Sequence, residues 1–316
     1  MDRVAAAVDQ MRPARPLALI ACFALSACAG PSPPVAKRLR VVTTFLPITL
    51  FTRAVAGDCA DVKALIPANA EPHHFQATPA DLAALKQAQL LVKNGLGGES
   101  FLSKLVAAAA NPGLVVINSS QGVKTLESPE AAHHGHSQIH SHGELNPHIW
   151  LDPLRAVQQV ENIRAGLIKA DPSCAAGYRN RAGVYISKLQ QLNAENSSKL
   201  KPYSGKTFVV FHDFAPYFAE RYKLKADYLV DVPEINPSPA DLQRVSAEVK
   251  RSQLKALLSE PQQGERSFNA LAKDLGVKII VFDPIETASA QAAQNPDTYF
   301  KLMRSNVAYL LKAFGG

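Results

Sequence analysis

Short runs of branched apolar residues alternate with helix-like segments along most of the chain, and this alternation occurs twice. The runs in the first half are residues 39–45, 61–66, 89–93 and 114–117. Those in the second half are residues 207–211, 226–230, 256–259 and 277–281. Strands separated by helices are typical of parallel sheets, and uninterrupted apolar strands indicate sheets covered on both faces. The sequence therefore predicts an α/β fold with two four-stranded parallel sheets.

Residues 174–200 form the longest helix-like segment and lie between the two halves. Its expected apolar side consists of Tyr178, Val184, Tyr185, Leu189 and Leu192. At about 1.5 Å per residue such a helix is about 40 Å long, enough to brace two domains. We therefore expect an N-terminal lobe over 39–173, a linker helix over 174–201 and a C-terminal lobe over 202–316, each lobe being a sheet flanked by helices.

The N-terminus resembles an export signal. Three arginines precede an apolar run at 17–25, which is too short to span a bilayer. The run ends in Leu25-Ser26-Ala27-Cys28, which resembles a bacterial lipobox. We expect residues 1–27 to be a lipoprotein signal peptide, Cys28 to be acylated, and the proline-containing segment 28–38 to be a tether. The protein would then be periplasmic and anchored to a membrane by lipid.

The formal net charge of +7 raises the question of an anionic partner. Lysines and arginines are scattered along the chain, however, and no aromatic residues are interleaved with a basic run. The charge pattern indicates a mildly basic surface and no nucleic-acid partner.

Histidines are concentrated between residues 131 and 148, which hold six of the nine. Glycines and irregular spacing argue against one helix face there, so we interpret 125–145 as an exposed loop that can chelate a late first-row metal. The alternative is a polar or pH-responsive loop. The five histidines of the loop are His133, His134, His136, His140 and His142.

Cysteine usage limits both the metal chemistry and the cross-links. After loss of the signal peptide only Cys28, Cys59 and Cys174 remain, too few for a zinc site built on paired cysteines. Two helices that start at the same sheet edge would deliver Cys59 and Cys174 to the opposite side of the first lobe. They are a candidate disulfide, and the alternative is two separate thiols.

Four potential metal ligands follow predicted strands, and His212 follows its strand directly. They are His73, His148, His212 and Asp283. Ligands of parallel sheets bind beyond the carboxyl ends of the strands, so two groups from each lobe would meet in a cleft between the lobes. Three imidazoles and one carboxylate suit tetrahedral zinc. The alternatives are hydrogen-bonded loop histidines and, at Asp283, a simple turn residue.

Three segments carry a family resemblance: EPHHFQATP at 71–79, NPHIWLDP at 146–153 and VVFHDFAPYFAERYKL at 209–224. They resemble the signature segments of the zinc and manganese solute-binding proteins of ABC transporters, which have a long rigid linker helix. The resemblance covers about residues 39–312. Two positions depart from the family pattern, because Gln76-Ala77 replaces Glu-Pro and Asn146 replaces Asp.

The resemblance implies a ligand set and partners. His73 rather than His74 would be the first ligand, followed by His148 and His212, where a manganese receptor commonly has Glu. Asp283 would be the fourth ligand, with Glu71 in reserve. The partners would be a membrane permease and its cytoplasmic ATPase, and the protein would be a monomer that carries Zn²⁺ as its transported ligand.

Several functions remain open from the sequence. Zinc capture for uptake is favoured over an Mn²⁺ or Fe²⁺ receptor, because imidazole favours zinc. A zinc-buffering or adhesive surface lipoprotein would use the same site. A zinc hydrolase is least favoured, since no H-E-x-x-H or G-x-S-x-G motif occurs and only Glu71 and Glu260 are candidate bases. We therefore expect a binding protein rather than an enzyme.

Overall fold

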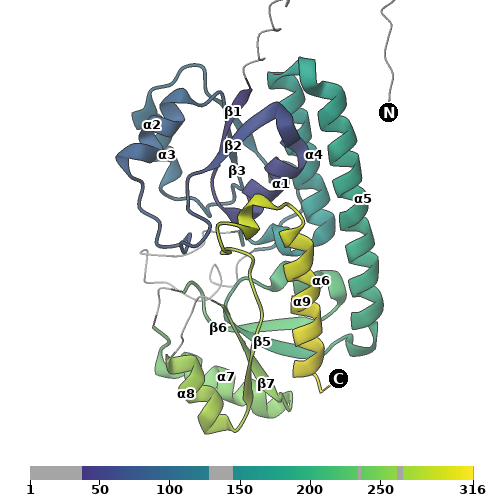
Figure 1. Cartoon of the computed structure of the whole chain (residues 1–316). Helices are drawn as coiled ribbons and strands as arrows, with labels where there is room; N and C mark the ends of the chain where they lie inside the picture. The colour runs from purple at the N-terminus through teal and green to yellow at the C-terminus, as the bar shows by residue number, and fades with distance from the viewer. Residues whose placement is uncertain (1–37, 128–144, 234–235, 262–265, 316) are drawn as a thin grey trace, which may run out of the picture. The chain divides into compact units, whose positions relative to one another are not determined.

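Two parallel four-stranded sheets organise the part of the chain that this computed structural model describes, residues 38–127, 145–233, 236–261 and 266–315. The strand order is β2-β1-β3-β4 in the first sheet and β6-β5-β7-β8 in the second, so both lobes have the same topology (Figure 1). The strands are β1 (Leu39–Thr43), β2 (Ala60–Ala64), β3 (Leu90–Lys93), β4 (Val115–Asn118), β5 (Thr207–His212), β6 (Lys225–Val230), β7 (Ala256–Ser259) and β8 (Lys278–Val281). The predicted fold class is confirmed.

Helices connect successive strands, and four of them begin at proline, which is favoured at the first helical position. The helices are α1 (Leu46–Ala56), α2 (Pro79–Gln87), α3 (Leu102–Ala109), α4 (Pro153–Ala170), α5 (Ala175–Leu200), α6 (Pro216–Tyr222), α7 (Pro239–Arg251), α8 (Arg266–Leu275) and α9 (Thr298–Ala313). Ser238 precedes α7, and its N–H donates to the Asp241 carboxylate at 2.9 Å. In return the Asp241 N–H donates to Ser238 Oγ at 3.2 Å, which completes a capping box.

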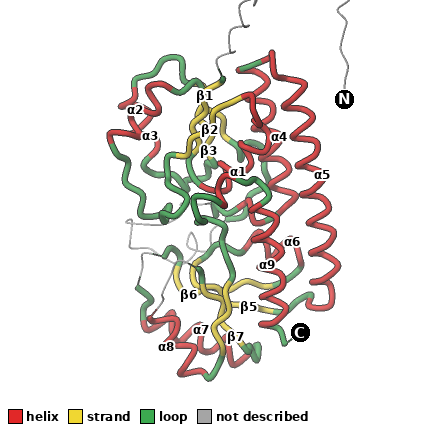
Figure 2. The backbone as a smooth tube through the Cα atoms, in the orientation of Figure 1, coloured by secondary structure: helices red, strands yellow, loops and turns green. Residues whose placement is uncertain are grey.

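The long helix α5 runs beside α4 and along both lobes (Figure 1), and the tube in Figure 2 shows both sheets to one side of it. Tyr178, Tyr185, Leu189 and Leu192 are buried as expected, but Val184 is 54% exposed. Val184 precedes Tyr185, and adjacent helical positions point about 100° apart, so the two cannot share one face. The residues buried by α5 belong to one apolar core that includes side chains of both sheets.

The last strand of each sheet is less buried than the sequence predicts. In β4, Val115 is 48% exposed and Val116 is 45% exposed, and in β8, Val281 is 39% exposed. Both strands lie at an edge of their sheet and have a neighbouring strand on only one side. An apolar run alone does not distinguish an edge strand from a central one, and for this reason the prediction of full burial was wrong at these positions.

Some sequence-based expectations lie outside the described residues. These are the signal peptide over 1–27, the acylated Cys28, most of the tether over 28–38, and His133, His134, His136, His140 and His142 of the proposed metal loop. Among the described residues, no helix is both long and apolar enough to cross a membrane.

Cys59 and Cys174 are joined by a disulfide on the side of the first lobe where the topology predicted them to meet, with their Cα atoms 6.3 Å apart. Cys59 ends the short turn after α1, and Cys174 directly precedes α5. Arg181 of α5 donates hydrogen bonds to Val55 O and Ala56 O, both at 2.8 Å. The disulfide and these hydrogen bonds together fix the start of the linker helix to the first lobe.

We predict that replacing both cysteines, Cys59→Ser with Cys174→Ser, lowers the free energy of unfolding by about 4–5 kcal/mol, because the bond closes a loop with a sequence separation of 115. Zinc affinity should stay unchanged, since neither cysteine belongs to the cluster formed by His73, His148, His212 and Glu286. Urea unfolding with and without reductant measures the effect. Reductant should destabilise the parent and leave the double variant unchanged, and equal effects on the two would contradict the prediction.

Candidate metal centre

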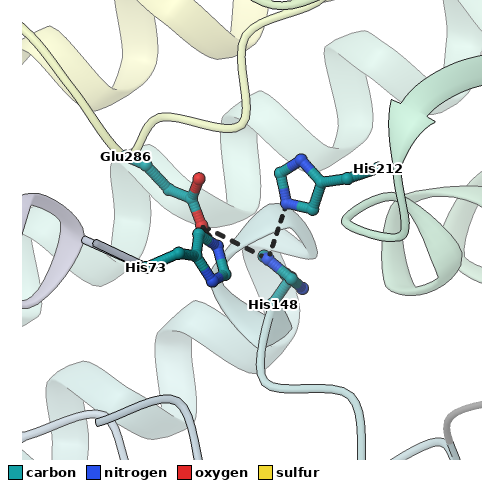
Figure 3. A group of neighbouring side chains, drawn as sticks. All are labelled: His73, His148, His212 and Glu286. Carbon is teal, nitrogen blue, oxygen red and sulfur yellow. Dashed lines mark hydrogen bonds and ion pairs between the residues drawn. The ribbon is translucent and has the colours of Figure 1, made fainter. Parts of the chain in front are cut away.

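Three histidines and a glutamate converge at the carboxyl ends of the strands. His73 lies in the loop after β2, His148 directly precedes the short helix Ile149–Leu151 before α4, and His212 is the last residue of β5. Glu286 follows β8. Their ligand atoms all lie within 4.8 Å of one another, and Figure 3 shows the four side chains pointing toward one another. Each lobe therefore supplies two of the four groups.

Three of the distances within this cluster match those expected around a small cation. Nε2 of His148 lies 3.4 Å from Nε2 of His212 and 3.3 Å from Oε1 of Glu286. Nε2 of His73 lies 3.4 Å from the same glutamate oxygen. Tetrahedral ligands at zinc bond lengths of about 2.0–2.1 Å are separated by about 3.3–3.4 Å. The four groups could thus hold one zinc ion with little rearrangement.

The cluster is shielded from water. His148 and His212 are fully buried, the Glu286 side chain is 1% exposed, and the His73 side chain is 13% exposed. The second oxygen of Glu286, Oε2, is buried and has no hydrogen-bond partner among the residues that the structure describes. A carboxylate oxygen that is buried without a hydrogen-bond partner costs free energy unless a cation or a water molecule interacts with it.

The fourth position of the cluster differs from the sequence-based expectation, because Glu286 occupies it instead of Asp283. The Asp283 carboxylate accepts a hydrogen bond from the Ile285 N–H at 2.7 Å. Ile285 has φ of 64°, a left-handed conformation that turns the chain sharply. Asp283 therefore stabilises the turn that brings Glu286 into the site. The sequence contained one signal for this ligand, because the loop after β8 has a second acidic residue, Glu286.

Two hydrogen bonds fix which imidazole nitrogen faces the centre. Nδ1 of His212 lies 2.5 Å from Glu260 Oε1, and a carboxylate can only accept, so this nitrogen donates. Nδ1 of His148 lies 2.9 Å from Asn146 Oδ1. The Asn146 amide group donates to Asp213 O at 2.7 Å, which identifies Oδ1 as its acceptor atom. Both Nε2 atoms are thereby left with lone pairs directed at the cluster, as metal ligation requires.

Burial and charge set the protonation states of the cluster. Burial lowers the pKa of His148 to about 4, so its imidazole is neutral at neutral pH. Burial alone would raise the pKa of Glu286, but His73 and His148 hold it well below its ordinary value. The site thus presents an ionised carboxylate and a neutral imidazole, both in the form that binds a metal.

The other expected residues surround the cluster without joining it. Glu71, the reserve ligand, accepts a hydrogen bond from the His73 N–H at 3.4 Å. His74 is exposed, in agreement with the choice of His73. Glu260, a candidate base for hydrolysis, contacts His212 instead. Trp150 is buried, and its indole N–H donates to Pro284 O at 2.8 Å, which ties the His148 segment to the loop that carries Glu286.

We predict that Glu71→Gln stabilises the metal-free protein increasingly as pH rises. Burial, and then the charge of Glu286, raise the pKa of Glu71 from 4.5 to about 8, so the unfolded chain ionises it at lower pH than the folded chain does. Glu71 therefore destabilises the fold progressively between these pH values, by on the order of 4 kcal/mol at most. Urea unfolding at pH 5 and pH 9 gives the difference.

The matched control for this measurement is Glu127→Gln, which removes an exposed carboxylate. Its effect on the free energy of unfolding should be small at both pH values. A Glu71→Gln effect that is the same at pH 5 and pH 9 would contradict the prediction.

Comparisons with known proteins find a matching family model and similar sequences and structures. A family model described as "Zinc-uptake complex component A periplasmic" matches residues 41–313. The high-affinity zinc uptake system protein ZnuA of Bacillus subtilis (strain 168) is 31% identical over 299 residues, which cover 92% of this chain and 93% of that protein. The zinc-binding lipoprotein AdcA of Streptococcus pneumoniae (strain ATCC BAA-255 / R6) is 30% identical over 297 residues, or 93% of this chain.

The match spans 59% of that AdcA, so this chain corresponds to part of the longer relative. The solved structure of the Zn(II)-bound ZnuA-like domain of Streptococcus pneumoniae AdcA is similar with a TM-score of 0.73 and 29% identity. The similarity covers 88% of this chain and 99% of the domain. The likeness in fold therefore includes both lobes and the helix between them.

Proposed function

This chain belongs to the family of periplasmic A components of zinc-uptake complexes, and we propose that it captures Zn²⁺ at His73, His148, His212 and Glu286. The observation that carries the proposal is the convergence of their four ligand atoms within 4.8 Å. An uptake component of this kind works with a membrane permease and an ATPase. The ion is the transported substrate, and the chain catalyses no reaction on it.

The donor set supports zinc over manganese. Three imidazole nitrogens and one carboxylate oxygen suit Zn²⁺, whereas Mn²⁺ prefers a site richer in oxygen ligands. Four protein ligands around a tetrahedral ion also leave no open coordination position, which a catalytic zinc would need for water. Glu260, one of the two candidate bases for a hydrolase, is already engaged with His212 at 2.5 Å.

The division of the ligands between the two lobes provides a way to release Zn²⁺ to the permease. His73 and His148 come from the first lobe, and His212 and Glu286 come from the second. A small separation of the lobes would leave the ion with two ligands on each side, and neither pair holds zinc tightly alone. We infer that docking on the permease separates the lobes and releases the ion.

The N-terminal segment and the histidine loop complete the proposal. We propose that residues 1–27 are removed, that acylated Cys28 anchors the periplasmic chain to a membrane, and that the chain acts as a monomer. The proposed role of His133, His134, His136, His140 and His142 is to recruit metal weakly near the principal site. The lipobox-like sequence and the density of imidazoles support these assignments.

We predict that Glu286→Gln weakens Zn²⁺ binding by more than tenfold, because it removes the only anionic ligand of the proposed set. Asp283→Asn should leave the affinity within about threefold, since the amide oxygen can still accept the Ile285 N–H. Calorimetric titration of the metal-free variants with Zn²⁺ separates the two. Tight Zn²⁺ binding by Glu286→Gln together with weak binding by Asp283→Asn would show that the fourth ligand is Asp283 and not Glu286.

We predict that deleting residues 131–142 removes weak, additional zinc binding and leaves one tight equivalent. The principal site draws all its groups from outside this loop, so its affinity should be retained. Equilibrium dialysis at increasing Zn²⁺ counts the bound ions, and His212→Ala is the reciprocal control that should retain only weak binding. Loss of the tight equivalent on loop deletion would contradict this division of roles.

A further inference from the structure

A lysine begins or directly precedes every strand of the second sheet. Lys225 and Lys278 are the first residues of β6 and β8, and Lys206 and Lys255 directly precede β5 and β7. The Lys225 N–H donates to Lys206 O at 2.9 Å, and the Lys278 N–H donates to Lys255 O at 3.0 Å. The strand order places these four residues, here called the lysine row, side by side along one edge of the sheet. With strands about 4.8 Å apart, the row is about 14 Å long.

The lysine row is exposed, and its charge is not neutralised. All four residues are exposed, and none forms an ion pair with a carboxylate of the described residues. Three of them line a depression of about 460 Å³, together with Arg251, which is itself paired with Glu248. Four like charges within about 14 Å repel one another. The stability of the fold therefore does not explain why four lysines occur at these positions.

The first sheet shows that the topology does not require such a row. It has the same strand order, yet among the residues that begin or directly precede β1, β2, β3 and β4 only Arg38 is basic, and Arg38 is paired with Asp61. The row is thus a property of the second lobe alone.

We propose that the lysine row is a contact surface for anionic lipid headgroups of a membrane. Ammonium groups are compact point charges without the planar fork by which arginine recognises one phosphate, so a line of lysines suits many phosphates spread over a surface. Each lysine near an anionic membrane strengthens binding by about fivefold. The family is periplasmic, and a periplasmic protein lies between membranes.

The geometry of β5 keeps this surface apart from the metal centre. Lys206 precedes the strand and His212 ends it, and six residues of strand extend about 20 Å. A chain resting on a membrane through the lysine row therefore has its metal ligands at the opposite end of the sheet. Contact with lipid and binding of zinc can occur together.

The test compares sedimentation of the full chain with anionic and with neutral phospholipid vesicles at low ionic strength. The row variant carries Lys206→Gln, Lys225→Gln, Lys255→Gln and Lys278→Gln. The control variant loses the same charge from exposed lysines of the first lobe, with Lys63→Gln, Lys86→Gln, Lys104→Gln and Lys169→Gln. The N-terminal segment is the same in all of them, so differences in binding report the lysines.

We expect the row variant to bind anionic vesicles about 600-fold more weakly than the parent, and the control variant to stay within about threefold. Unchanged zinc affinity shows that the row variant is folded. If it is not folded, Lys206→Gln and Lys225→Gln alone should each cost about fivefold. Equal binding by row and control variants would overturn the proposal, as would binding of the parent to duplex DNA but not to vesicles.

Discussion

A buried carboxylate that needs a cation is the constraint on which the metal centre depends. Glu286 is almost fully enclosed, and removing a charge from water costs several kcal/mol unless an opposite charge is close. In the metal-free chain the imidazoles of His73 and His148 stabilise the ionised form. A bound Zn²⁺ would take over that role with twice the charge. The need for a cation thus explains both the burial of the site and its fit to a metal.

The same chain has to hold the lobes together and still let them separate at the site. One apolar core, lined by α5 and α9, joins the lobes. Asp152, four residues after His148, adds a polar connection, because its carboxylate accepts hydrogen bonds from Arg155 of its own lobe and from Arg221 of the other. The shared core reaches the site itself, because the rings of Trp150 and Phe214 lie 5.0 Å from those of His148 and His212, centroid to centroid.

Much of this structure could be predicted from the sequence because the signals were local. Branched apolar runs identified the strands, and the rule that parallel strands bind ligands at their carboxyl ends brought His73, His148 and His212 together. The fourth group could not be placed this way. Asp283 is the residue that directly follows the strand, but a turn through Ile285 with positive φ carries the chain past it to Glu286. The course of such a turn depends on contacts that a single sequence does not reveal.

The Asn146 side chain connects the orientation of the His148 imidazole with the contact between the two lobes. Its oxygen orients His148, while its amide group donates to the Asp213 carbonyl and carboxylate in the other lobe. Tyr217 reinforces the connection by donating to Asn146 O at 2.7 Å. When the lobes part, the imidazole loses its fixed orientation at the same moment as the ion loses half its ligands. On the proposed separation of the lobes, metal ligation and the contact between the lobes would therefore be lost together.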